Sequence, residues 1–414
     1  MTHMAGTKPA ALTAIAGLLL TGLQMVTSAP VIAASPAPGA ARVQPAPAGE
    51  WVAGDLHVHT TYSHDSYGGP DDDNTEVDQA YTAGHSVEQA FRLADERDLD
   101  FLTISDHNDV RSQTDKGFGR FGVIGVRAYE NSLRGHAQML GADHIHDNGD
   151  SAASDVRRIA SKLRADGGVF GVNHPAEASG FPHELDWSYG YQVVPDVVEA
   201  WNVMTLWQPP LPAANNNDDN VRYWEGWLDR GKRVAAVGGS DSHWASTSAV
   251  QGPGQPTTWV YVTDHSEAGI LEGLRQGRTS IAAQPPALSG VRVFLEADGD
   301  QDGVWESMVG DTVPAGSALR VRVEGGAGTL VRLVATGGRQ AGEAVPVTGE
   351  RFTHDFAVND DATWVRAEVF REDAADVRQL CDPLVGDRTS YCRNRIAREA
   401  MTSAIYLGNT VPPP

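Results

Sequence analysis

The chain has 414 residues, and its 54 Asp and Glu side chains outnumber its 32 Lys and Arg side chains, which gives a formal net charge of −22. Proteins that bind nucleic acids gather Lys and Arg against the phosphates, so this balance argues against a nucleic-acid partner. The composition, 41% hydrophobic and 21% charged, is that of a globular protein. Two cysteines exclude a disulfide-dense scaffold and a thiolate metal cluster, so a metal site has to use His, Asp and Glu.

The N-terminal segment predicts export. A basic residue precedes an apolar run of small residues over 10–26, which is typical of a secretory signal peptide, here residues 1–34. Because the run is short and is interrupted by Thr, Gly and Gln, we expect no stable membrane anchor and a secreted, periplasmic or extracellular protein. Residues 35–49 are rich in Pro and Ala and predict a linker. In an oxidising compartment, Cys381 and Cys392 are expected to form a disulfide.

Residues 50–286 predict an α/β domain, because apolar strand-like segments alternate with helical ones along this range. The predicted strands end in polar side chains, and in a barrel such strand ends converge on the face where chemistry takes place. These strand-end residues are His57 and His59, Asp106 and His107, Asn173 and His174, Glu199 and Asn202, and Asp241 and His243.

Residues 287–414 have a different pattern of apolar and polar residues. Segments with alternating apolar residues are separated by turns rich in Gly and Asp. This pattern predicts a small antiparallel module of the β-sandwich type.

The histidines indicate a metal site. His57 and His59 lie two residues apart, so on a strand both imidazoles face the same side and can bind one ion. Three further strand ends carry metal-capable groups, in Ser105-Asp106-His107, Asn173-His174-Pro175 and the run from Gly238 to His243. A single buried histidine is usually a hydrogen-bonded core residue, whereas histidine at the polar ends of four strands is not a common packing pattern.

Four motifs follow one another along the chain: GDLHVHTTYSHDS at 54–66, TISDHND at 103–109, VNHP at 172–175 and GGSDSH at 238–243. In this order they resemble the motifs of the PHP (polymerase and histidinol phosphatase) metallohydrolases. GRTSI at 277–281 and MTSAIYLG at 401–408 further resemble the exported branch that includes carbaryl-hydrolase-type enzymes. The resemblance implies a distorted seven-stranded (β/α) barrel with two or three divalent metal ions (Zn²⁺, Mn²⁺ or Fe).

The resemblance also implies the ligands. The first metal would be held by His57, His59, Glu130 and Asp241, and the second by Glu130, His136 and His174. A third would take His107 and His243 with an additional group from the first motif, for which we prefer Asp65 and keep His64 as the alternative. Asp106 is expected to orient an imidazole rather than bind metal.

The implied chemistry is hydrolysis by water activated between two metals, with Glu130, Asp241 and His243 as catalytic residues. The leaving group would be protonated by His243 or by a metal-bound water. The expected substrate is a small phosphoester, and the alternative is a carboxylic or carbamate ester. Arg127 and Arg134 are the nearest basic candidates for holding a phosphate, but few Lys and many Asp surround the motifs, which favours a diester or a neutral ester over a monoester.

Two other sequence features, and one other class of function, leave alternatives open. His144 and His146 repeat the H-x-H spacing in a predicted loop and are expected at the surface. The segment from Asp298 to Gly303 resembles the start of a calcium loop, but Val309 occupies the twelfth position where an EF-hand needs Glu, so only a looser calcium turn is possible. A catalytically silent extracellular binding protein is the alternative from another class.

Overall fold

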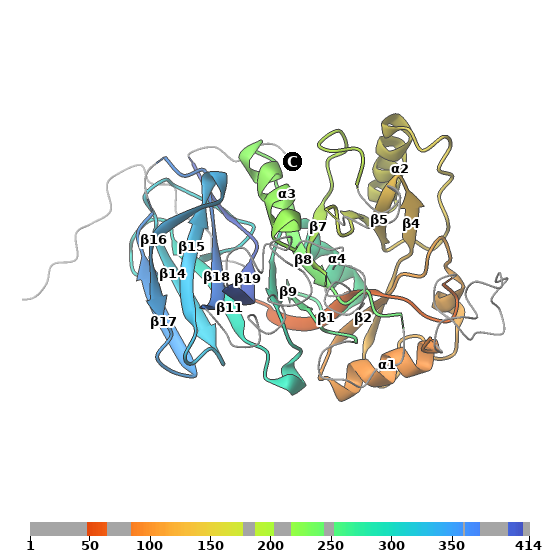
Figure 1. The fold of residues 1–414 in the computed structure, drawn as a ribbon, viewed down its shortest axis with the longest axis horizontal. Helices are drawn as coiled ribbons and strands as arrows, with labels where there is room; N and C mark the ends of the chain where they lie inside the picture. The colour runs from red at the N-terminus through yellow and green to blue at the C-terminus, as the bar shows by residue number, and fades with distance from the viewer. Residues whose placement is uncertain are drawn as a thin grey trace, which may run out of the picture. The chain divides into compact units, whose positions relative to one another are not determined.

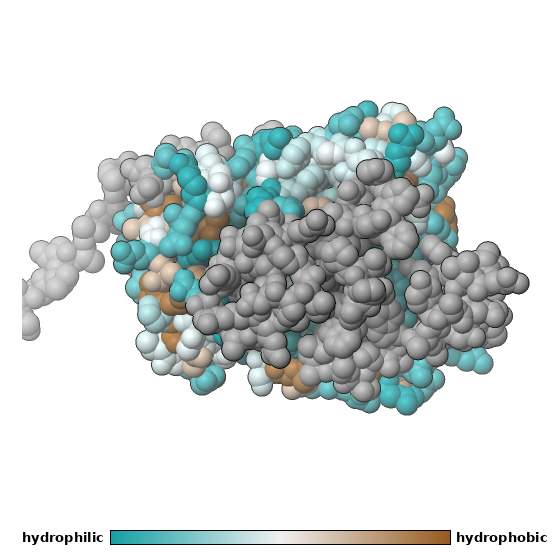
Figure 2. Space-filling view, in the orientation of Figure 1, coloured by the Kyte–Doolittle hydropathy of each residue, from teal (hydrophilic) through white to brown (hydrophobic). Residues whose placement is uncertain are grey.

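The computed structural model describes residues 48–63, 84–176, 187–202, 217–243, 252–358, 361–372 and 396–408. The signal peptide, nearly all of the linker, Asp65, His64 and both cysteines lie outside these ranges. No helix within the described ranges combines the length and the apolarity that crossing a membrane requires. The face shown in Figure 2 is mostly hydrophilic where it is described, with separate smaller hydrophobic patches.

The described residues form a mixed α/β structure (Figure 1). One sheet has five strands in chain order: β4 (Glu130–Leu133), β5 (Gly135–Leu140), β6 (Val169–Val172), β7 (Val197–Asn202) and β8 (Ala235–Gly239). Strands β6, β7 and β8 are parallel, whereas β5 is antiparallel to both of its neighbours, β4 and β6. In the second sheet, β1 (Glu50–Val58), β2 (Phe101–Ile104) and β3 (Ile124–Arg127) are parallel.

Two isolated bridges join these sheets at the ends of their strands. Val58, the last residue of β1, bridges Ser242 just beyond β8, and His107 beyond β2 bridges Glu130 at the start of β4. Both bridges are parallel. They place the carboxyl ends of β1, β2 and β8 beside the first residue of β4, which is where the predicted metal ligands lie.

The predicted alternation of strand and helix is interrupted after β3, because β3, β4 and β5 follow one another without a helix. The cause is a tight reversal between β4 and β5, in which Leu133 pairs with Gly135. Gly135 has a φ of +103°, which glycine adopts without steric cost. The reversal brings His136 opposite Ser132, close to Glu130.

Within the described ranges, four α-helices cover the strands: α1 (Val87–Glu96), α2 (Ala153–Ala165), α3 (Asn217–Asp229) and α4 (Glu267–Arg275). Helix α1 begins with a capping box between Ser86 and Gln89, which satisfies otherwise unpaired backbone donors. Its apolar face, including Phe91, belongs to the same buried cluster as Ile104 of β2. Helix α3 buries Trp224 in the cluster that contains residues of β6, β7 and β8. Short 3₁₀ helices cover Arg111–Thr114, Pro286–Leu288 and Thr336–Gly338.

The large sheet continues from β1 across the boundary expected at residue 286. Strand β1 pairs with β9 (Thr257–Val262), β9 with β10 (Thr279–Ala282), and β10 with the C-terminal strand β19 (Ile396–Thr402), all antiparallel. The other strands on that side are β13 (Thr312–Val313), β15 (Leu330–Ala335), β16 (Arg339–Pro346), β18 (Trp364–Glu372) and β20 (Ile405–Leu407).

A separate four-stranded antiparallel sheet consists of β12 (Ser307–Met308), β11 (Arg292–Asp298), β14 (Ala318–Glu324) and β17 (Arg351–Phe356). Val293 and Val321 of this sheet share one buried apolar cluster with Leu333 and Val369 of the large sheet. The predicted antiparallel strands are therefore present, while the β-sandwich, the (β/α)₇ barrel and the domain boundaries stay predictions.

A buried charge network joins the C-terminal strands to α3. Arg398 of β19 donates from Nε to Glu368 of β18 and from Nη2 to Asp218 of α3, each at 2.8 Å. Glu368 is fully buried and also accepts from Arg366 at 3.1 Å. Burial alone would raise the pKa of Glu368, but the arginines, Arg398 first, hold that pKa below its ordinary value.

We expect Arg398→Met to lower the free energy of unfolding by about 3 kcal/mol, because it leaves Glu368 and Asp218 less compensated in a buried setting. The matched control is Arg371→Met, since Arg371 is 46% exposed where it pairs with Glu399 and such a pair contributes at most about 1 kcal/mol. Urea unfolding of both variants measures the difference. Equal losses of unfolding free energy in the two variants would contradict the stabilising role of the buried network around Arg398.

Candidate functional site

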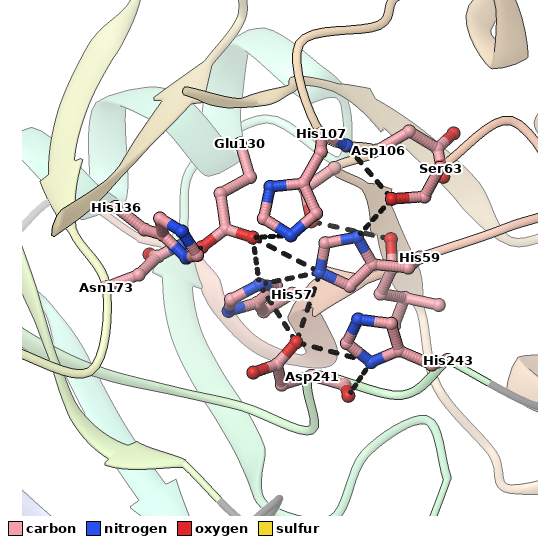
Figure 3. Close-up of polar contacts among 12 residues, drawn as sticks. His57, His59, Ser63, Asp106, His107, Glu130, His136, Asn173, Asp241 and His243 are labelled. Carbon is pink, nitrogen blue, oxygen red and sulfur yellow. Dashed lines mark hydrogen bonds and ion pairs between the residues drawn. The ribbon is translucent and has the colours of Figure 1, made fainter. Parts of the chain in front are cut away.

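Six imidazoles and two carboxylates converge where the sheets meet. Figure 3 labels all of them except His174. All eight side chains are buried, between 0% and 9% exposed. They come from the ends of β1, β2, β6 and β8 and from the β4–β5 hairpin. The eight are His57, His59, His107, Glu130, His136, His174, Asp241 and His243.

The first group surrounds one point. His57 Nε2 lies 3.0 Å from His59 Nε2, and both nitrogens lie between 3.1 and 3.3 Å from Glu130 Oε2 and Asp241 Oδ1. Around an ion with metal–ligand bonds of ~2.0–2.2 Å, neighbouring ligand atoms are about 3.0–3.5 Å apart. The four residues therefore fit a single divalent cation.

The second carboxylate oxygen of Glu130 faces another group. Glu130 Oε1 lies 3.1 Å from His136 Nδ1 and 3.3 Å from His174 Nε2. Asn173 also donates to this oxygen at 2.7 Å. Because its two oxygens face different imidazoles, Glu130 has the placement of a carboxylate shared by two ions.

His107 and His243 lie on the remaining side of His59. His107 Nε2 is 3.3 Å from Glu130 Oε2. The ring of His243 stacks on that of His59 with centroids 4.2 Å apart. These three histidines form a further group with metal-ligating spacing.

The far nitrogen of three imidazoles contacts an oxygen, which fixes the orientation of each ring. His57 Nδ1 lies 2.9 Å from Glu199 Oε1, His59 Nδ1 lies 3.1 Å from Ser63 Oγ, and His107 Nδ1 lies 3.0 Å from Ser132 Oγ. We assign the proton to Nδ1 in each ring, so that the Nε2 lone pairs point at Glu130 and Asp241. Two lone pairs 3.0 Å apart require a positive charge between them, and this arrangement is typical of metal-ligating histidines.

Glu199 of β7 holds several parts of this cluster, although sequence reasoning placed it at a strand end and not in the site. Besides His57, it accepts from the backbone N–H of His174 at 2.9 Å and from Asn202 at 3.1 Å. Asn202 also donates to Asp241 Oδ2 at 3.1 Å. An acidic residue inside the apolar strand VVEAWN was the available signal, because a buried carboxylate needs partners.

Close packing at Gly239 preserves the contact between His57 and Glu199. A Cβ on Gly239 would lie 2.4 Å from the Cβ of His57 and 2.5 Å from Glu199 Oε1. The second glycine of the GGSDSH motif therefore has a steric reason. Beyond it, Asp241 has a φ of +50°, and His174 on the other side of the cluster has a φ of +22°. Such backbone strain at non-glycine residues is concentrated at functional sites.

The pKa values of the cluster also indicate that its carboxylates need positive charge beside them. Burial alone would raise the pKa values of Glu130 and Asp241, but the imidazoles, His57 first, hold both well below their ordinary values. Burial alone would lower the pKa of His57, but Asp241, Glu130 and Glu199 raise it well above its ordinary value. The cluster thus keeps its carboxylates ionised, as metal ligands must be.

Some predicted site residues lie elsewhere. Arg127 pairs with Glu267 of α4, with its Nε 3.1 Å from either carboxylate oxygen, and Arg134 is exposed at the β4–β5 turn. The prediction that His144 and His146 are both surface residues is wrong for His146, which is buried against the hydroxyl of Tyr129.

For Asp106, the expected contact with an imidazole is not found among the described residues. Asp106 accepts from the backbone N–H of Thr60 at 2.6 Å and from its hydroxyl group at 2.9 Å, rather than from an imidazole. It therefore fixes the chain directly after His59.

Comparisons with known proteins give limited likenesses. A family described as "Protein of unknown function (DUF3604)" matches residues 47–118, and no curated protein matches. One similar solved structure is a two-domain protein from Bacteroides vulgatus described as containing a predicted PHP-like metal-dependent phosphoesterase. It has a TM-score of 0.40 and 13% identity over 80% of this chain and 94% of that chain. The lesion-specific endonuclease PfuEndoQ from Pyrococcus furiosus has a TM-score of 0.33 and 13% identity over 55% of this chain and 56% of its own.

A seventh histidine supports the segment that carries Asp241. His85 is fully buried, and its Nε2 lies 3.2 Å from the backbone carbonyl of Ser242. Burial lowers the pKa of His85 from 6.5 to about 4. The folded protein therefore keeps this ring neutral at a pH where the unfolded chain protonates it.

This difference predicts an acid-sensitive contribution to stability. It is fully present above pH 6.5 and is lost as the pH falls toward 4, at about 1.4 kcal/mol per pH unit. Between pH 7 and pH 5, we expect wild type to lose about 2 kcal/mol more than His85→Gln, because glutamine takes up no proton. Urea unfolding at both pH values measures this, with His265→Gln, at an exposed histidine, as the control. Equal losses in wild type and His85→Gln would refute it.

Proposed function

We propose that the chain is an exported, PHP-type, metal-dependent hydrolase of the carbaryl-hydrolase-like branch, with a distorted (β/α)₇ barrel, and that it cleaves a phosphoester. The observation that carries the proposal is the set of Nδ1-anchored imidazoles whose Nε2 atoms face Glu130 and Asp241. This arrangement would destabilise an ordinary hydrophobic core, because burying so many polar groups costs free energy unless a ligand compensates them.

The residues divide among the proposed ions by their contacts. His57, His59, Glu130 and Asp241 would hold the first ion, and Glu130 with His136 and His174 the second. His107 and His243 would hold a third, together with Asp65 or His64, which lie outside the described residues. Imidazole and carboxylate ligands suit Zn²⁺, Mn²⁺ or Fe.

Divalent ions in these positions would activate a water molecule and neutralise the charge that develops on the substrate. The protein's own contribution is to keep the ligands fixed and ionised. Glu130 and Asp241 do this as buried carboxylates held by imidazoles. His243 Nδ1 lies 2.8 Å from the carbonyl oxygen of Asp241, which puts the ring proton on Nδ1. That contact sets the ring's orientation beside His59 for ligation or for proton transfer to the leaving group.

The charges around the cluster favour some substrates over others. Within the described residues, the ion pairs of Glu130, Glu199 and Asp241 are all with histidines, and no Lys or Arg joins them. A phosphate monoester carries about two negative charges, for which Arg is the usual partner. A phosphodiester therefore fits better. The same observation supports a carboxylic or carbamate ester as the second candidate.

The proposal predicts about two or three bound metal ions per chain after reconstitution with Zn²⁺ or Mn²⁺. We expect His57→Ala to contain fewer metals and to lose hydrolysis, since His57 contacts both carboxylates of the first group. Elemental analysis is combined with turnover of p-nitrophenyl phosphate, bis-p-nitrophenyl phosphate and a p-nitrophenyl ester, with His265→Ala as control. The preferred substrate separates phosphoesterase from esterase. Less than one metal per chain and no turnover would leave a silent binding protein instead.

Glu199→Gln tests the orientation of His57. Glu199 accepts from His57 through Oε1 and from the backbone N–H of His174 through Oε2, whereas the amide has one acceptor oxygen and no charge. Because His57 is then less firmly oriented, we expect metal affinity to fall about 10–100-fold. Competition with a chelator measures the affinity, and Glu272→Gln, an exposed carboxylate on α4, is the control. Unchanged affinity would show that Glu199 has no part in metal binding.

A further inference from the structure

The last residue of β11 and the loop that leads from it to β12, together called the acidic loop, carry four acidic side chains in nine residues. They are Asp298, Asp300, Asp302 and Glu306, at positions 1, 3, 5 and 9 of the run DGDQDGVWE. Position 6 is Gly303, with a φ of +91°. In calcium loops, positions 1, 3 and 5 supply oxygen ligands, and a glycine at position 6 permits the sharp turn. Val309 at position 12 excludes the EF-hand, so Glu306 is the residue that could replace its glutamate.

The strand register places the first and last of these residues opposite each other. In the antiparallel pair, Glu296 lies opposite Met308 and Ala297 opposite Ser307, so the next position sets Asp298 opposite Glu306. Both are buried, at 3% and 8% exposure. Like charges directly across a strand pair destabilise it, and burial makes the repulsion stronger.

The hydrogen bonds of the loop leave carboxylate oxygens without a partner. Glu306 Oε1 accepts from the backbone N–H of Gly299 at 2.9 Å, which holds this carboxyl group over the start of the loop. Its other oxygen, Oε2, is shielded from solvent and has no hydrogen-bond partner, and the same is true of Asp300 Oδ1. An unpaired buried carboxylate oxygen is costly, so a cation bound at these two atoms would be favourable.

Among the described residues, no basic side chain compensates the charge of this loop. None of the four carboxylates forms an ion pair with Lys or Arg within the described part of the chain. Arg320 stacks on the ring of Trp305 in this loop, but its guanidinium pairs with Asp355 at 2.7 Å.

The chain already wraps around Asp298. Its carboxylate accepts from the backbone N–H groups of Asp302 at 3.2 Å and Gly303 at 2.8 Å. Each oxygen keeps a second lone pair. Asp302 Oδ1 in turn accepts from the backbone N–H of Val304 at 2.8 Å. The loop is thus closed on itself, with carboxylates at both ends.

We propose that this loop binds one Ca²⁺ ion through the carboxylates of Asp298, Asp300, Asp302 and Glu306. The offered ligands are oxygen atoms only, which suits a hard cation and not the imidazole-preferring ions of the cluster around Glu130. Mg²⁺ demands a rigid octahedron and keeps several waters, whereas Ca²⁺ accepts the irregular set of carboxylates that a short loop offers. The site lies in the C-terminal half of the chain and does not depend on the proposed hydrolase activity.

The loop contains its own reporter, because Trp305 lies between two of the proposed ligands in sequence. Tb³⁺ binds in calcium sites and emits when a nearby tryptophan is excited. With the full chain stripped of metals, we expect Tb³⁺ emission that Ca²⁺ displaces, and that Trp305→Phe removes without weakening Ca²⁺ binding in calorimetry. Performing the titration also in His57→Ala separates this site from the hydrolytic cluster, and the Ca²⁺ signal should be unchanged there.

Two ligand variants and one control complete the test. Glu306→Gln and the exposed Asp302→Asn should each weaken Ca²⁺ binding about ten-fold or more, since affinity follows the ligand charge. Glu343→Gln, at an exposed carboxylate of β16, should bind like wild type. Ca²⁺ should also raise the melting temperature of wild type, and less so in Asp302→Asn. The proposal is overturned if wild type shows no Ca²⁺ binding heat, if the two variants bind Ca²⁺ as tightly as wild type, or if Trp305→Phe retains the Tb³⁺ emission.

Discussion

One buried carboxylate, that of Glu130, is the interaction on which the site depends. Its two oxygens face imidazoles that come from both sheets, and it is 1% exposed. A carboxylate in such a place is stable only where positive charge surrounds it. The folding of two sheets, the β4–β5 reversal and the isolated bridge between His107 and Glu130 all serve to bring that charge within reach.

Further partners keep the imidazoles from rearranging. Glu199, Ser63 and Ser132 each contact the far nitrogen of one ring, and Asp106 fixes the backbone at Thr60. Because these contacts fix the orientation of each ring, the Nε2 atoms face the two carboxylates before any ion arrives. Preorganisation of this kind is what separates a metal site from a chance gathering of histidines.

The C-terminal strands are connected to the strands that carry the site. Strand β19 hydrogen-bonds to β10, and Arg398 links β18, β19 and α3 through buried carboxylates. Asn217, the first residue of α3, exchanges hydrogen bonds with the backbone of Asn202 at the end of β7. Strand β7, which carries Glu199, is therefore connected to the C-terminal half of the chain. That half also contains the acidic loop after β11, in which like charges lie close together.

The sequence by itself determined the local features. Apolar alternation indicated an α/β region followed by antiparallel strands, and the spacing of His57 and His59 put two imidazoles on one face. These features depend on residues close in the chain, so periodicity reveals them. The resemblance supplied Glu130 and His136, which no local pattern singles out.

Only the tertiary structure decided which distant groups meet. Glu199 contacts His57, which is 142 residues away in the sequence. Asp106 accepts a hydrogen bond from Thr60 and not from an imidazole. His146 is buried against the hydroxyl of Tyr129. The same holds for Asp298 and Glu306, whose pairing follows from the β11–β12 register. Contacts of this kind arise from strand order and register, which a one-residue shift would change completely and which composition and spacing do not encode.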